Sequence, residues 1–156
     1  MREQVLKQFF EGRVSAAELA TDIRSSKKNV GDKVTLVCIE DMDGRFSVTR
    51  SMLVSLCDAV LAGSLPPEGL RTIGFALEAS DNFDWDSEED ELVANVIADW
   101  SCPEVNYSLT LENVRRFRAW LLEQEPYPEK PLGVAEHAGD AISVVAKKVI
   151  KHRRQT

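Results

Sequence analysis

Apolar residues recur at helical spacing over much of the chain, so the pattern predicts helices as its main elements. The first predicted helix covers residues 2–11, and its apolar face consists of Val5, Leu6, Phe9 and Phe10. Ser15 and Glu18 then have the spacing of a capping box, in which each side chain accepts a hydrogen bond from the other residue's backbone N–H. A second amphipathic helix is therefore expected after Ser15.

Four further helices are expected between residues 50 and 121. The first has its apolar face at Leu53, Leu56, Cys57, Val60 and Leu61, and it ends before Gly63. The next is expected to use Ser64 as its cap and to carry Pro66 and Pro67 in its first turn. Helix 88–100 ends at Cys102-Pro103, and Thr110 caps the last helix.

Gly74 lies in the middle of one of these helices, where glycine costs about 1 kcal/mol relative to alanine. A close helix crossing at Gly74 explains this cost, and a kink is the alternative.

Residues 34–40 (VTLVCIE) and 45–49 (RFSVT) are rich in β-branched and apolar side chains, which is typical of strands. Asp43-Gly44 between them is a strong hairpin signal. We therefore expect one short hairpin across residues 34–49. The alternative is a helix over 34–41 followed by a turn.

Three prolines in residues 125–131 predict a stiff, extended linker. We expect an acidic helical domain at 1–124, a proline-rich linker at 125–132 and a basic tail at 133–156. The tail is either helical, since Ile142, Val145 and Val149 have nearly helical spacing, or disordered. The predicted fold class is mainly α, a small helical bundle with one short β-hairpin and a C-terminal basic tail.

The net charge of −7 and the pI near 4.9 disfavour a nucleic-acid binder, except through the basic tail. Residues 1–146 hold 14 basic against 26 acidic side chains, a net charge of −12. Three cysteines without a C-x-x-C pair predict free thiols and a cytoplasmic location, with Cys57 in the core. Neither a secretory signal nor an apolar stretch of about 20 residues occurs, so no membrane contact is expected.

The acidic run between helices is the main candidate site. Its proposed partner-binding residues are Asp81, Phe83, Asp84, Trp85, Asp86, Glu88 and Glu89. Ser87 as an N-cap and carboxylates in the first turn would explain Glu88 and Glu89 by helix stability alone. The earlier carboxylates around two rings favour a surface for a basic protein, because charge speeds encounter and aromatic side chains anchor it. Asp84-x-Asp86 lacks the glycine and glutamate of a calcium loop, so no metal is expected.

Catalytic motifs are missing from the sequence, which contains no P-loop, G-x-S-x-G or G-x-G-x-x-G. The two histidines, His137 and His152, both lie beyond the prolines. We expect a non-enzymatic binding module without catalytic residues or cofactor. The alternatives are a small carboxylate-based enzyme and a regulatory scaffold protein.

Two stretches resemble a known family. Residues 9–19 (FFEGRVSAAEL) are similar to the F-L-x-G-x-I-S-x-x-E-F opening of bacterial colicin-D-type immunity proteins, and residues 67–74 (PEGLRTIG) to a helix start in the same group. The resemblance implies a small, acidic, helical protein that binds a cytotoxic nuclease and blocks its basic RNA site. An uncharacterised bacterial family fits the sequence equally well.

Overall fold

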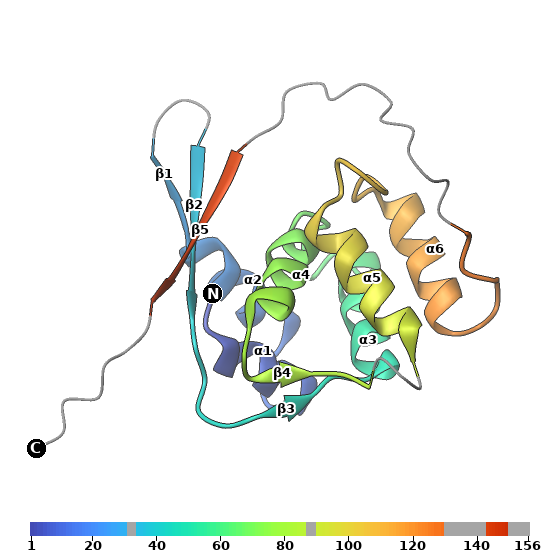
Figure 1. The fold of residues 1–156 in the computed structure, drawn as a ribbon, viewed down its shortest axis with the longest axis horizontal. Coiled ribbons are helices and arrows are strands. Elements are labelled where there is room, and N and C mark those ends of the chain that lie inside the picture. Colours follow the sequence, from blue (N-terminus) through green and yellow to red (C-terminus); the bar gives the residue numbers. More distant parts are fainter. Residues whose placement is uncertain (31–33, 87–89, 130–142, 150–156) are drawn as a thin grey trace, which may run out of the picture.

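A bundle of helices with a narrow β-sheet at one side makes up most of the chain (Figure 1). The computed structural model describes residues 1–30, 34–86, 90–129 and 143–149. The helices are α1 (Glu3–Phe10), α2 (Ala16–Ser25), α3 (Arg50–Leu61), α4 (Gly69–Ala79), α5 (Glu91–Ser101) and α6 (Leu111–Leu121). The strands are β1 (Lys27–Asn29), β2 (Val34–Glu40), β3 (Phe46–Ser47), β4 (Phe83–Asp84) and β5 (Ser143–Val149). The prediction of a mainly helical fold with one short hairpin is confirmed.

The hairpin itself lies at a different place from the one we predicted. Strand β2 pairs antiparallel with β1, with Lys27 opposite Val37, whereas β3 pairs in parallel with β4. Gly44 does adopt the positive φ of a turn, at 79°. The chain nevertheless does not fold back on β2, because Met42 is buried and its backbone N–H donates to the Glu3 carboxylate. This contact draws the connection toward α1 and away from β2.

The second edge of β2 is occupied by β5. The two strands pair in parallel from Val34 opposite Ser143 to Glu40 opposite Val149. The helical alternative for this part of the tail is therefore wrong, and the β-branched residues of the segment SVVAKKV agree with a strand. Residues 133–142 and 150–156 of the tail lie outside the described residues, as does the linker beyond residue 129.

Two of the predicted helix caps are confirmed and one is wrong. Ser15 and Glu18 form the complete capping box of α2, and the Thr110 side chain accepts a hydrogen bond at the start of α6. Ser64 does not cap α4, which begins only at Gly69. The residues after Ser64 instead bury Leu65 in the core, which delays the start of the helix.

Helices α4 and α5 approach each other closely at Gly74. A Cβ atom built there would lie 2.8 Å from the backbone nitrogen of Ser101, 2.9 Å from the Cβ of Trp100 and 3.0 Å from the carbonyl oxygen of Ile97. Such distances are too short for ordinary van der Waals contact. Gly74 is therefore the site of a close helix crossing. This confirms the crossing as the explanation for a glycine in the middle of the helix.

We expect Gly74→Ala to lower the free energy of unfolding by about 1–3 kcal/mol, because the new methyl group overpacks the crossing. In an exposed helix the same change would stabilise by about 1 kcal/mol. Urea unfolding measures the difference. Gly69→Ala in the same helix is the matched control, since its nearest contact is the flexible end of Leu65. Equal effects of the two variants would contradict a close crossing.

The register of β5 can be tested by a cross-link. Cys38 lies opposite Lys147 in the paired strands, and neighbouring strands are about 4.8 Å apart, which suits a disulfide. In a Cys102→Ser background, Lys147→Cys is expected to form an intramolecular disulfide with Cys38 under mild oxidation. Lys148→Cys, whose partner is Ile39, should form far less. Non-reducing peptide mapping distinguishes them, and comparable yields would overturn the register.

Candidate functional site

The acidic segment is shaped first by Ser80, which ends α4. The Ser80 hydroxyl accepts hydrogen bonds from the backbone N–H groups of Asn82 and Phe83, at 2.9 and 3.1 Å. Serine competes for backbone groups in this way and so favours a turn over continued helix. The turn sends the chain into β4, along the lower side of the bundle in Figure 1.

Strand β4 is held against β3 by backbone and side-chain hydrogen bonds. The N–H of Phe46 donates to the carbonyl of Asn82, and the N–H of Val48 donates to the carbonyl of Asp84, both at 2.8 Å. The Ser47 hydroxyl also donates to the Asp84 carboxylate at 2.5 Å. These bonds fix Asp84 at the outer side of the β3–β4 pair.

The structure places the predicted site residues unequally. Asp81, Asp84 and Asp86 are exposed, and Trp85 is half-buried at the edge of the core. Phe83 is only 5% exposed, so the expectation of an exposed anchoring ring at this position is wrong. The two-residue pairing with β3 turns its ring into the core, where it contacts Phe46. Glu88 and Glu89, together with the proposed cap Ser87, lie outside the described residues.

Rings from other elements adjoin this segment, and the sequence analysis did not assign them to the site. Phe46 lies with its ring centroid 6.1 Å from that of Phe10 and nearly parallel to it, and 6.1 Å from Phe83 at a right angle. Phe10 and Phe46 are half-buried. We call Phe10, Phe46, Asp81, Asp84, Trp85 and Asp86 together the acidic–aromatic surface.

The buried carboxylate of Glu3 accepts hydrogen bonds from residues that lie close in sequence to β3 and β4. Glu3 is fully buried, and its Oε2 accepts hydrogen bonds from the Met42 backbone N–H at 2.9 Å and from Asn82 Nδ2 at 3.1 Å. These bonds offset part of the cost of burying the carboxylate. They join α1, the β2–β3 connection and the start of β4, so Glu3 positions both strands of the site.

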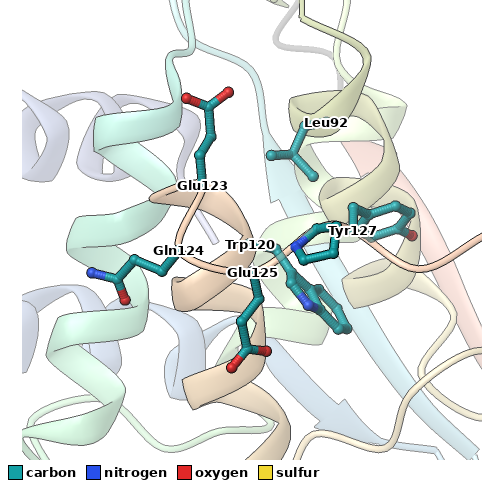
Figure 2. A pocket seen from close by; sticks show the side chains of 7 residues that line it. Leu92, Trp120, Glu123, Gln124, Glu125 and Tyr127 are labelled. Atoms are coloured by element: carbon teal, nitrogen blue, oxygen red, sulfur yellow. The ribbon is translucent and has the colours of Figure 1, made fainter.

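A hollow of about 460 Å³ lies where the chain leaves α6 (Figure 2). Its lining residues are Leu92, Trp120, Glu123, Gln124, Glu125, Pro126 and Tyr127. Figure 2 shows the side chains of Glu123, Gln124 and Glu125 diverging rather than converging on one point. Acid–base catalysis needs groups that converge on a reacting atom, and this arrangement does not provide them.

Two polar residues that line this hollow, Glu123 and Tyr127, make contacts that stabilise the fold. Arg50, at the start of α3, binds Asp90 at 2.5 Å and Glu123 at 2.7 Å. Asp90 is the N-cap residue of α5, so the predicted helix start at residue 88 is displaced to Glu91. The Tyr127 hydroxyl donates to the buried Asp99 carboxylate at 2.6 Å. These contacts link the ends of α3, α5 and α6 to one another.

The three cysteines are free thiols in different surroundings. Cys57 is fully buried, as expected, and burial raises its pKa to about 12, so it stays protonated at neutral pH. Cys38 is half-buried and Cys102 is exposed. Within the described residues, no group of three or more His, Cys, Asp or Glu side chains is arranged to hold a metal ion.

Comparisons with other proteins do not identify the chain. It matches no known protein family, no curated protein and no solved structure. No helix in the part of the chain that the structure describes combines the length and the hydropathy needed to cross a membrane.

We expect Tyr127→Phe to lower the free energy of unfolding by about 1.5 kcal/mol near neutral pH, because Asp99 loses a hydrogen-bond donor. Burial, and then the bond to Asp99, raise the pKa of Tyr127 above its ordinary value of 10.0. The stabilisation is thus fully present below pH 10 and is lost as the pH rises further. Urea unfolding from pH 8 to 11 should show wild type losing stability more steeply than the variant. Parallel curves would contradict this role.

Proposed function

We propose that this chain is a non-enzymatic protein-binding module that neutralises a basic protein, in the manner of an immunity protein or antitoxin. The observation that carries the proposal is the geometry of the β3–β4 pair. The pair exposes Asp84, which Ser47 fixes, and leaves Phe46, which packs on Phe10, half-buried. Asp81, Trp85 and Asp86 flank β4, and both of these aspartates are exposed.

The aromatic rings supply the anchoring part of such an interface. Phe10, Phe46 and Trp85 each leave part of the ring accessible while the rest packs on the core. A ring that is already held loses little conformational freedom on binding, and the burial of its remaining apolar surface favours the complex. Aromatic residues at the centre of an interface commonly carry much of its binding energy.

The carboxylates supply the recognition of charge. Residues 1–146 have a net charge of −12, and Asp81, Asp84 and Asp86 are exposed in β4 and the residues that flank it. An acidic surface attracts a cationic partner over distances comparable to the Debye length, about 8 Å at physiological salt. Association is then fast and sensitive to salt.

A cationic site on the partner that binds RNA would also bind this surface, because phosphates and carboxylates compete for the same basic side chains. The resemblance of residues 9–19 and 67–74 to colicin-D-type immunity proteins favours a cytotoxic nuclease as that partner. The proposal places the encounter in the cytoplasm, where the three free thiols stay reduced.

The test is a comparison of captured partners. Asp81→Asn/Asp84→Asn/Asp86→Asn is expected to lower the recovery of a basic protein from lysate of the source cells at least about tenfold, as several charge-assisted contacts are lost together. Capture at 50 mM and 500 mM salt with quantitative mass spectrometry measures this recovery. High salt should reduce the recovery by the wild-type chain as well.

The matched control removes three exposed carboxylates in α6 and the residues that follow it. Glu112→Gln/Glu125→Gln/Glu129→Gln changes the net charge by the same amount and should leave capture nearly unchanged. Trp85→Ala should weaken capture at both salt concentrations, because its contribution is apolar. Acidic or uncharged partners that are insensitive to salt, or equal losses in both triple variants, would contradict the proposal.

A further inference from the structure

A second cavity lies away from the acidic–aromatic surface. It is a cleft of about 750 Å³ between strands β1 and β2, helix α4 and the connection from α5 to α6. Among its lining residues are Lys27, Val37, Arg71, Phe75, Cys102 and Leu109. Its size falls within the range of about 300–1,000 Å³ that is typical of sites for small molecules.

The floor of the cleft is apolar. Val37 on β2 and Phe75 on α4 face the cleft from two elements, and Pro103 and Leu109 close it from the α5–α6 connection. Val37 is buried, whereas Phe75 and Leu109 are half-buried. An apolar ligand group that covered these two side chains would remove their remaining surface from water, which favours binding.

Two cationic side chains lie at the rim of this floor. Arg71 Nη2 donates to Glu104 Oε1 at 3.0 Å, a contact through one nitrogen that leaves the other guanidinium donors available. The Lys27 ammonium makes no hydrogen bond or ion pair with any described residue. The Lys27 side chain is exposed at the edge of the cleft, so its charge is accessible to a ligand. An ammonium in this situation is stabilised by an anion placed beside it.

The rim also carries the carboxylates of Glu68 and Glu104, so its formal charge is balanced. Glu104 is engaged by Arg71. Glu68 attracts Lys27 but does not come within ion-pair distance of it, since no Lys27 ion pair occurs among the described residues. Lys27 is therefore the lining cation whose ammonium is available to pair with an anionic group of a ligand.

We propose that this cleft binds a small amphiphilic carboxylate, with its carboxylate at Lys27 and Arg71 and its apolar chain over Val37, Phe75 and Leu109. The site is independent of the acidic–aromatic surface, with which it shares no residue. A ligand in this position lies beside Cys102, whose exposed thiol lines the same cleft. Occupancy of the cleft should therefore protect this thiol from chemical modification.

The experiment uses the full-length protein and octanoate as the probe. The rate of Cys102 alkylation by iodoacetamide is followed by peptide mass spectrometry over a range of octanoate concentrations below micelle formation. We expect a saturable decrease in the rate at Cys102 and no comparable change at Cys38. Octanol and octylamine carry the same chain without the negative charge, and they should protect at least about tenfold more weakly.

Matched lysine variants test the placement of the charge. Lys27→Met should weaken protection by octanoate about tenfold, which corresponds to the loss of one charge-assisted hydrogen bond. Lys28→Met, the next residue of the same exposed strand, makes the same change in net charge outside the cleft and should have little effect. Thermal unfolding of each variant checks that the fold is retained.

Three outcomes would overturn the proposal: no saturable protection of Cys102, protection by octylamine or octanol equal to that by octanoate, or equal losses in Lys27→Met and Lys28→Met. None of these results bears on the binding of a basic protein at the acidic–aromatic surface. The two proposals therefore stand or fall separately.

Discussion

The close crossing of α4 and α5 at Gly74 is the packing constraint on which both candidate surfaces depend. With no side chain at Gly74, the backbone of α4 lies directly against Trp100 and Ser101. One end of α4 leads through Ser80 into β4 and the acidic–aromatic surface. The face of α4 near the crossing carries Phe75, which forms the cleft together with the residues that follow α5. A shift of one helix against the other would move parts of both surfaces.

Local patterns predicted the helical part of the fold well. Helical periodicity located the apolar faces, and the Ser15–Glu18 spacing identified a capping box that the structure contains in full. The glycine in the middle of α4 indicated a close approach before any partner helix was known. These features depend on residues within a few positions of one another, so the sequence contains most of the information needed to predict them.

The strands were predicted less well because their partners are distant in the sequence. The segment 34–40 was expected to be a strand and is one, but its β-branched composition does not distinguish among β1, β5 and residues 45–49 as neighbours. Phe83 shows the same limit for the candidate site. Its alternation with Trp85 suggested two exposed rings, whereas pairing of β4 with β3 buries the first and leaves the second half-exposed. The cleft draws residues from three separate parts of the chain, and no local spacing connects them.

The pairing of β2 with β5 has a consequence for how the protein is made. Strand β2 leaves the ribosome well before its neighbour β5, because about 100 residues separate Glu40 from Ser143. During that interval an apolar strand has one edge without its native neighbour, and such edges pair readily with other chains. Nascent molecules are therefore vulnerable to aggregation until β5 has emerged, and a ribosome that stalls in the proline-rich segment prolongs this period.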